Sequence, residues 1–575
     1  MTLRPRALAT VAAVATLLTS GVLLAPSAAA EPAAGAAPAP TSTKAAAGSY
    51  TPAAPLWGAC GSERLQAAQA QCALLEVPLD YDEPGGTTIK LALSRVLHTT
   101  KRDQGIMLVN PGGPGGSGLG LSTLGRAVPD GAGDSYDWIG FDPRGVGASE
   151  PAVSCDPTYL GYGRPRYVPT TPAVSDAWFT RSKAYTDACA KKNGPILDHL
   201  TTVDSAKDME SIRKALGEKK INYYGFSYGT YLGQVYGTLY PKRLRRVVFD
   251  GTVDPRGIWY EDNLDQDRAF DATMNTWFAW VAENDAVYHL GTTEAAVRRT
   301  FYRAQDELDA NPAKGEQGRI SGNEWNDVFL SAGYYVYGWA DLATAFAAYV
   351  KKGDISGVED AFGFDPDDAA ADNGYAVYLG VQCTDTRSWP ERWSTWSKDA
   401  WRIFDKSPYL TWNNTWYNEP CLHWPGKQHK EVKISGKKVK SVLMISESLD
   451  AATPFSGSLE VRKRFPKARL IEGVGGTTHA GSLSGVACVD DRIADYLATG
   501  DLPKRKSGRK ADVRCGAVPA PEATAMTRSS RKAASKDLDE LRKRRAALNP
   551  ALTGTPGPPS RWVGRVVWGA VGGRA

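Results

Sequence analysis

The sequence predicts an α/β protein, with a mainly parallel sheet flanked by helices and a mostly helical cap inserted between two strands. Three observations support this fold class. A glycine-flanked serine turn at residues 225–229 follows an apolar strand and precedes a helix. Two further unbroken apolar runs end in glycine-rich turns, as strands buried on both faces of a parallel sheet do. The alternation of strand and helix stops near residue 256 and resumes near residue 433.

The chain of 575 residues is longer than one hydrophobic core usually serves. We therefore expect a core in two parts, residues 56–255 and 433–520, around a cap at residues 256–432 that holds twelve of the 17 tryptophans. Residues 521–575 carry eleven Lys/Arg and four Asp/Glu, so the net charge of +5 comes from this tail, which we expect to be largely disordered. The slightly acidic remainder does not favour nucleic acid as a partner.

The first 30 residues have the pattern of an export signal. Two arginines precede an apolar stretch at residues 7–24, and three alanines at residues 28–30 offer a cleavage site. An uncleaved membrane anchor is the alternative, because the apolar run is nearly long enough to span a bilayer. The small residues at its end favour cleavage, after which we expect no stable anchor. Residues 31–55, rich in Ala, Pro and Thr, are expected to form a flexible pro-segment or linker.

Eight cysteines follow the export signal, and an even number in an exported chain indicates disulfides. Spacing alone does not determine connectivity, but the cysteines fall into four couples that are close in sequence. We expect these couples to be bonded: Cys60–Cys72, Cys155–Cys189, Cys383–Cys421 and Cys488–Cys515. A zinc site is not indicated, because the sequence has no Cys-x-x-Cys pair. We expect no metal and no other cofactor.

The elements of the core are expected in the following order. A hairpin is predicted first, then two buried strands that end in Gly/Pro-rich turns. A helix is expected from a cap at Asp204/Ser205 to Leu216, before the strand that leads into the serine turn. A closing helix is expected at residues 491–499. The predicted strands are residues 73–79, 89–96, 105–110, 138–141, 221–224, 244–250, 439–446 and 468–472.

Ser227 is the candidate nucleophile. Its strand–turn–helix context describes the nucleophile elbow of an α/β-hydrolase, because Gly225 and Gly229 allow the sharp turn that exposes the serine Oγ. A serine nucleophile needs a base, a carboxylate that orients the base, and amides that bind the oxyanion. In this fold the acid and then the histidine follow the serine along the chain.

His479 and Asp450 are the candidate base and acid, since each lies just past a predicted strand. Asp250, at the end of the strand that follows the elbow, is the rival acid, and Asp450 could instead cap a helix. The oxyanion hole would use the backbone amides of Tyr228 and Gly113. The glycine-rich turn around Gly113 lacks the βαβ context of a dinucleotide-binding loop.

Five segments carry a family resemblance, namely residues 110–118, 141–147, 225–233, 373–378 and 450–454. They resemble the secreted tripeptidyl aminopeptidases of actinomycetes, α/β-hydrolase serine peptidases related to proline iminopeptidase. The likeness covers roughly residues 55–515. It implies Ser227, Asp450 and His479 as the triad, and release of tripeptides from peptides with a free N-terminus. Proline iminopeptidases carry a histidine before the Gly-Gly-Pro turn, where this chain has Asn110-Pro111 like the tripeptidyl branch.

An aminopeptidase must also bind an α-ammonium, which requires a carboxylate at a fixed distance from Ser227. The candidates are Glu261, Asp262 and Asp385, although a solvated charge is the better account of any single one of them. The alternative function is a secreted carboxylesterase with the same triad. A hydrolase-like binding protein without activity is a third hypothesis, and the presence of all three triad residues argues against it.

Overall fold

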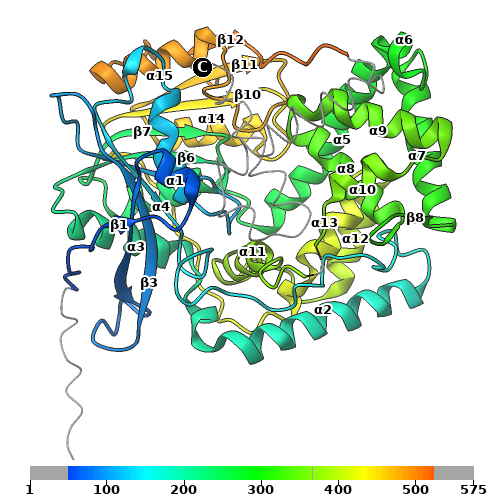
Figure 1. Cartoon of the computed structure of the whole chain (residues 1–575), viewed down its shortest axis with the longest axis horizontal. Helices are drawn as coiled ribbons and strands as arrows, with labels where there is room; N and C mark the ends of the chain where they lie inside the picture. The colour runs from blue at the N-terminus through cyan, green and yellow to red at the C-terminus, as the bar shows by residue number, and fades with distance from the viewer. Residues whose placement is uncertain (1–49, 366, 524–575) are drawn as a thin grey trace, which may run out of the picture. The chain divides into compact units, whose positions relative to one another are not determined.

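The computed structural model describes residues 50–365 and 367–523. The predicted signal peptide, most of the predicted linker and the tail from residue 524 onward lie outside the described residues. The framework is a ten-stranded sheet with the order β1-β2-β3-β5-β4-β6-β7-β10-β11-β12 (Figure 1). Its strands are β1 Gly58–Ala59, β2 Gln71–Pro78, β3 Thr88–Val96, β4 Ile106–Asn110, β5 Asp137–Phe141, β6 Ile221–Phe226, β7 Leu244–Asp250, β10 Val442–Glu447, β11 Ala468–Val474 and β12 Val513–Gly516.

The sheet is antiparallel at one edge and parallel elsewhere. The hairpin β2–β3 and the pair β3–β5 are antiparallel, whereas every pair from β5 to β12 is parallel. All residues of β4, β6 and β10 are buried, as expected for apolar strands covered on both faces. The α/β class and the mainly parallel sheet predicted from the sequence are therefore confirmed. The short strands β1 and β12 were not predicted, because two and four residues carry little pattern.

Helices cover both faces of the sheet. Alternate residues of β4 show this directly, since Ile106 and Leu108 pack in one core with α3, α4 and α14, and Met107 and Val109 pack in another with η1 and α15. These helices are η1 Leu119–Ala127, α3 Thr202–Ala215, α4 Tyr228–Leu239, α14 Phe455–Arg464 and α15 Ala487–Thr499; α1 Glu63–Ala67 and η2 Pro129–Gly131 are shorter.

The predicted start of α3 is wrong by a few residues. The helix is capped by Thr201, whose Oγ1 accepts a hydrogen bond from the Asp204 amide at 3.0 Å, so Asp204 lies in the first turn and not at the cap. The closing helix α15 likewise begins four residues before the predicted residue 491. Both differences concern helix ends, where several polar residues compete for the capping position.

The segment between β7 and β10 forms a helical layer beside the sheet (Figure 1). It has a core of its own, rich in aromatic residues such as Trp277, Phe301, Trp325 and Phe346. The helices fall within the predicted cap at residues 256–432, and the division into domains stays a prediction. They are α5 Tyr260–Glu283, α6 Asp285–Tyr288, α7 Glu294–Ala310, α8 Gly322–Tyr334, η4 Val336–Gly338, α9 Trp339–Lys352, α10 Ser356–Phe362, α11 Asn373–Thr384, α12 Trp393–Phe404, α13 Thr411–Asn418 and η5 Glu419–Leu422, with a two-stranded hairpin of β8 Ala313–Lys314 and β9 Arg319–Ile320.

One long helix of the first core segment packs with the cap. Helix α2 (Pro172–Asn193), followed by η3 (Gly194–His199), places Trp178 in a stack with Trp416 of α13, with ring centroids 5.6 Å apart. Part of the segment 56–255, predicted as core, therefore contributes to the packing of the cap. The sequence pattern did not indicate α2, because its buried stripe includes Ser182, Thr186 and Cys189 and is only weakly apolar.

All eight cysteines are bonded in the four predicted pairs, Cys60–Cys72, Cys155–Cys189, Cys383–Cys421 and Cys488–Cys515. Each bond closes a loop of 12 to 38 residues, which limits the conformational freedom of the unfolded chain. Within residues 50–365 and 367–523, no helix combines the length and the apolar character needed to cross a membrane.

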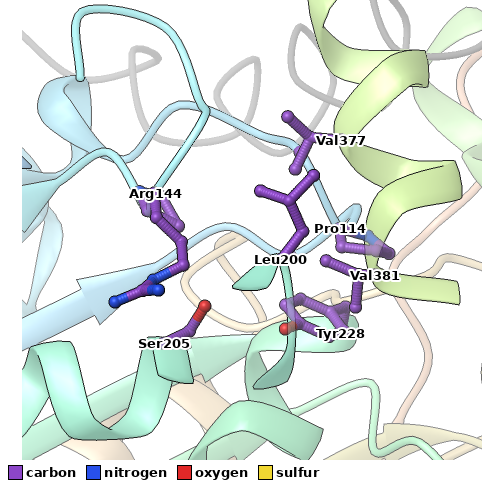
Figure 2. A pocket seen from close by; sticks show the side chains of 10 residues that line it. Pro114, Arg144, Leu200, Ser205, Tyr228, Val377 and Val381 are labelled. Atoms are coloured by element: carbon purple, nitrogen blue, oxygen red, sulfur yellow. The ribbon is translucent and has the colours of Figure 1, made fainter. Parts of the chain in front are cut away.

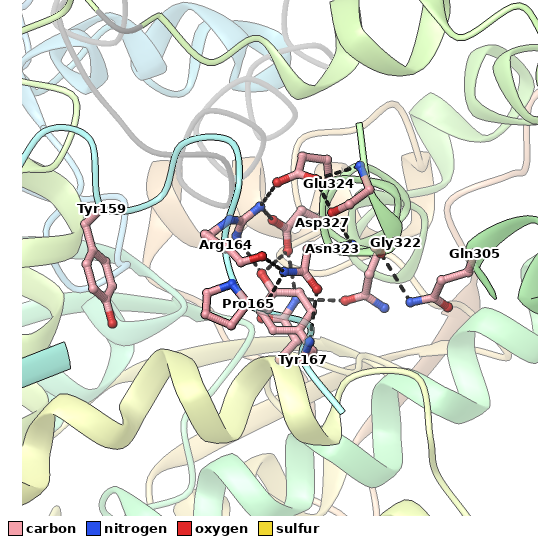
Figure 3. A network of polar contacts seen from close by, with 12 residues as sticks. Tyr159, Arg164, Pro165, Tyr167, Gln305, Gly322, Asn323, Glu324 and Asp327 are labelled. Carbon is pink, nitrogen blue, oxygen red and sulfur yellow. Dashed lines mark hydrogen bonds and ion pairs between the residues drawn. The ribbon is translucent and has the colours of Figure 1, made fainter. Parts of the chain in front are cut away.

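A buried ionic network joins the chain before α2 to the cap helix α8 (Figure 3). The guanidinium of Arg164 lies 3.0 Å from Glu324 Oε1 and 2.7 Å from Asp327 Oδ2, and all three side chains are almost fully buried. Tyr167 OH donates to the other oxygen of Asp327 at 2.9 Å. Glu324 also accepts the backbone N–H of Ser321 and completes the capping box of α8. One cation therefore forms ion pairs with two buried carboxylates.

We predict that Arg164→Met lowers the free energy of unfolding by about 3–5 kcal/mol, because it leaves two buried carboxylates without a cation. Arg166→Met is the matched control, since the Arg166–Asp309 pair is half-exposed and worth at most about 1 kcal/mol. Denaturant unfolding of both variants measures the difference. Equal losses of stability would contradict the role given to the Arg164 network.

Candidate active site

Ser227 lies at the sharp turn between β6 and α4, in a conformation that few residues other than glycine adopt. Its backbone angles are φ 53° and ψ −127°. A Cβ atom at Gly225 would lie 2.6 Å from the carbonyl oxygen of Gly229, and one at Gly229 would lie 2.7 Å from that of Asn110. Both positions therefore need glycine. The turn holds Ser227 at the end of β6 and at the N-terminus of α4, where the helix dipole favours developing negative charge.

His479 is held by the carboxylate of Asp450. Its Nδ1 atom lies 2.9 Å from Asp450 Oδ2 and 3.0 Å from Oδ1. Asp450 in turn accepts hydrogen bonds from the amides of Ala452 and Thr453 and from the Thr453 hydroxyl, at 2.8 to 3.0 Å. Both members of the pair are at least 98% buried. The carboxylate therefore orients the imidazole with a proton on Nδ1, which leaves Nε2 to act as a base.

The imidazole also lies beside the nucleophile turn. The Ser227 amide donates to the carbonyl oxygen of Asp250 at 2.9 Å, and a Cβ atom on the next residue, Gly251, would lie only 2.9 Å from His479 Cε1. His479 therefore packs on Gly251, the residue directly after Asp250, whose carbonyl oxygen binds the Ser227 amide. Its Nε2 atom is buried and has no hydrogen-bond partner among the described residues. Hydrogen bonds of a catalytic site are often long in the free enzyme and tighten with substrate.

The glycine-rich turn after β4 packs directly on the elbow. The Gly112 amide donates to Asn110 Oδ1 at 3.0 Å, and a Cβ atom on Gly112 would lie 2.8 Å from Ser227 Cβ and 3.0 Å from the Tyr228 nitrogen. The Gly112 amide is thus already used, which leaves Gly113 as the predicted donor of the turn. Figure 2 shows a small cavity behind this turn, between the Tyr228 ring and Val377 and Val381 of α11.

The rival acid, Asp250, has a different partner. Its Oδ2 atom accepts the amide of Ser482 at 2.8 Å, three residues past His479, and burial raises the pKa of its carboxyl to about 6. Asp250 therefore fixes the backbone of the histidine loop, whereas Asp450 holds the imidazole itself. Among the described residues, no group of three or more His, Cys, Asp or Glu side chains could hold a metal ion.

Comparison with known proteins agrees with this geometry. Residues 105–477 match the family model described as the alpha/beta hydrolase fold. The chain is 40% identical, over 81% of its length and 86% of the relative's, to a Streptomyces coelicolor protein named tripeptidyl aminopeptidase. The chain belongs to the α/β hydrolase family. Its relation to the actinomycete tripeptidyl aminopeptidases, predicted from five motifs, is confirmed, and the protein is a serine hydrolase.

Two Mycobacterium tuberculosis relatives of this hydrolase are more distant. The serine protease Hip1 is 28% identical over 78% of this chain and 89% of its own length. Carboxylesterase B is 31% identical over 80% of this chain and 92% of its own length. Relatives named as peptidases and as an esterase therefore match this chain over most of its length.

Glu447, the last residue of β10, is a buried carboxylate that sequence reasoning did not single out. Its Oε2 atom accepts the amide of Thr478 at 2.8 Å, next to His479, and its Oε1 atom accepts the amide of Val518 at 2.7 Å. Burial raises the pKa of this carboxyl to about 8. Its position at a strand end, three residues before Asp450, was the available signal. Glu447 ties the histidine loop of the hydrolase to the segment after β12.

The three predicted amine-binding carboxylates lie in different surroundings. Glu261 is exposed at the start of α5. Asp262 is packed against the turn at Gly257, and burial raises its pKa well above the ordinary range. Asp385 accepts the amide and the hydroxyl of Thr202, and burial raises its pKa to about 7. Among the described residues, no hydrogen bond or ion pair joins any of the three to Ser227 or His479.

Asp450→Asn should lower kcat about 10⁴-fold, because an amide at this position no longer holds the imidazole in the required tautomer. Asp250→Asn is the matched control, since an asparagine oxygen can still accept the Ser482 amide; its kcat should stay within about tenfold of the wild type. Steady-state kinetics on any accepted substrate measures both. The reverse order of effects would make Asp250 the acid.

Stability should fall as the pH rises from about 5 to 9, in part because of Glu447. Its folded pKa of about 8 lies above its ordinary value of 4.5, so its contribution is full below pH 4.5 and is lost as the pH rises through 8. In Glu447→Gln this part of the decline should disappear, because glutamine does not titrate. Denaturant midpoints at several pH values measure it, with Glu472→Gln on β11 as the control, where Glu472 is a partly exposed partner of Arg514. An unchanged decline in Glu447→Gln would refute the assignment.

Proposed function

We propose that this hydrolase removes tripeptides from peptides with a free amino terminus, by way of an acyl-enzyme on Ser227. The observation that carries the proposal is the Asp450–His479 pair beside Ser227, in a chain that is 40% identical to a protein named tripeptidyl aminopeptidase. Peptides with free N-termini would be its partners. The site as a whole matches what acyl transfer needs, which is a nucleophile, an oriented base and backbone amides.

The proposed reaction has two half-reactions. The Ser227 Oγ attacks the carbonyl carbon of the third residue while His479 Nε2 takes its proton, and the amides of Tyr228 and Gly113 bind the oxyanion. The C–N bond then breaks, and His479 gives the proton to the leaving amine. In the second half-reaction, water attacks the ester carbonyl while His479 takes one of its protons. The bond to Ser227 Oγ then breaks, His479 gives the proton to Oγ, and the tripeptide leaves as a carboxylic acid. The positive charge that His479 acquires is stabilised by Asp450.

We further propose that the protein is exported with residues 1–30 as its signal. Four disulfides support this proposal, because structural disulfides persist in oxidising compartments outside the cytoplasm. Export would also bring the enzyme to extracellular peptides, which are substrates of the proposed class.

A secreted carboxylesterase is the second candidate function. The relative named carboxylesterase B covers 80% of this chain, and the same three side chains can cleave an ester as well as an amide. What separates the two functions is recognition of the substrate's amino terminus, because an esterase has no need to bind an α-ammonium.

The purified protein should hydrolyse Ala-Pro-Ala-p-nitroanilide and lose most of this activity when the amino terminus is acetylated. The acetyl group removes the charge that an aminopeptidase recognises, and burying an unpaired partner typically costs at least about tenfold in rate. Release of p-nitroaniline measures both reactions, with p-nitrophenyl butyrate as the ester control. Turnover of the butyrate without cleavage of either peptide would favour the esterase.

A further inference from the structure

A buried carboxylate on α5, Asp267, accepts a hydrogen bond from an amide side chain and forms no ion pair with any residue that the structure describes. It is only 1% exposed. Its Oδ1 atom accepts a hydrogen bond from Asn414 Nδ2 at 2.9 Å, and Asn414 also bonds the carbonyl oxygen of Asn263. The neighbouring Arg268 is paired instead with the exposed Asp265 at 2.7 Å. A buried carboxylate held by neutral groups alone is costly, unless a cation joins it or it takes up a proton.

Asp267 lies close to the loop of the catalytic acid. Gln266, the residue before it, donates its Nε2 to the carbonyl oxygen of Ala452 at 2.7 Å, two residues past Asp450. At its N-terminal end, α5 begins next to Trp259, whose ring lies 5.9 Å from that of Tyr228. Helix α5 therefore begins beside Tyr228, the residue after Ser227, and contacts the loop of Asp450 through Gln266.

Aromatic side chains connect this cluster to the histidine. Phe270, one turn after Asp267, packs on Tyr334 with ring centroids 4.7 Å apart, and the Tyr334 ring lies 5.8 Å from His479. Tyr378 of α11 donates to Asn418 Oδ1 at 2.9 Å and lies 3.5 Å from Asn263 Oδ1. Asp267 is among the charges that raise the pKa of Tyr378, after burial as the main cause. Tyr334 and Tyr378 are only partly buried, so they can border a bound substrate.

Three oxygen-bearing side chains are linked around this part of α5. Asn414 donates to the Asp267 carboxylate and to the carbonyl oxygen of Asn263, and Asn418 Nδ2 donates to Asn414 Oδ1 at 2.9 Å. Carboxylate and amide oxygens are acceptors of the kind an ammonium group requires.

We propose that Asp267, together with the amide oxygens of Asn263 and Asn418 and with Tyr378, binds the α-ammonium of the substrate. This inference rests on the proposed aminopeptidase function and replaces Glu261, Asp262 and Asp385 as the amine-binding residues. The ammonium supplies the cation that the buried carboxylate lacks.

The test compares Asp267→Asn with the matched control Asp265→Asn, which makes the same change of charge two residues away on the exposed side of α5. Substrates are Ala-Pro-Ala-p-nitroanilide, its N-acetyl form and p-nitrophenyl butyrate. Asp267→Asn should lower kcat/KM for the free peptide by about 30-fold or more, mostly through KM, because a buried charge pair is lost. The acetyl peptide and the butyrate should change less than about threefold in Asp267→Asn, and Asp265→Asn should behave as the wild type with all three substrates.

Tyr378→Phe provides a second variant that leaves the carboxylate in place. It should raise KM for the free peptide by about five- to tenfold, through loss of one hydrogen bond, and should raise KM for the acetyl peptide much less. If Asp267→Asn has a lowered melting temperature or does not accumulate as folded protein, Tyr378→Phe alone shows whether this cluster binds the α-ammonium.

The outcomes separate the two proposals. A wild-type enzyme that cleaves free and acetylated peptides equally well overturns the aminopeptidase function itself. If the wild type discriminates between them and Asp267→Asn discriminates equally well, with Tyr378→Phe unchanged, the function stands and the amine site lies elsewhere. Selective loss of the free peptide in both variants establishes the site.

Discussion

The register of four neighbouring parallel strands determines where the predicted catalytic side chains lie. Phe226 of β6 pairs with Asp250 of β7, Asp250 pairs with Ile445 of β10, and Ile445 pairs with Ile471 of β11. The row lies at the last residues of β6 and β7, and two and three residues before the ends of β10 and β11, all at the carboxyl ends of the strands. Ser227, Asp450 and His479 follow it by one, five and eight residues. A parallel sheet brings the carboxyl ends of its strands to the same edge, so three side chains far apart in sequence can work together.

Buried carboxylates stabilise the loops that extend beyond this edge. Asp450 holds its own loop through two amides and a hydroxyl, while Asp250 and Glu447 each accept an amide from the loop that carries His479. Burial raises the pKa of both Asp250 and Glu447. The position of the imidazole thus depends on three acidic side chains, of which only Asp450 contacts it.

The helical layer between β7 and β10 contributes to the site as well as covering it. Gly374 of α11 lies against Gly115, in the glycine-rich turn after β4. The two are so close that not even the methyl group of alanine would fit at Gly115. Helix α5 contacts the acid loop through Gln266 and Thr273. The polar cluster around Asp267 lies on this same helix. The proposed amine site and the contacts to the Asp450 loop therefore share one helix.

Much of the framework could be predicted from the sequence, because buried parallel strands leave unbroken apolar runs and the elbow requires glycine at Gly225 and Gly229. The Asp450–His479 pair was also accessible, since chain order and strand ends restrict the choice. Helix α2 was not, because its buried stripe is polar in part. Glu447 had only its place at a strand end as a signal, and Asp267 had none, because the backbone amides and the asparagine that bond them come from distant parts of the chain.

The central claim is that Ser227 is a nucleophile activated by His479, and covalent labelling tests it most directly. A fluorophosphonate reacts with an activated serine by displacement of fluoride, and peptide mass spectrometry then locates the adduct. The account predicts one adduct per chain, on the peptide that contains Ser227, and its loss in His479→Ala. Labelling of a different serine, or labelling of Ser227 that persists at full rate without His479, would contradict it.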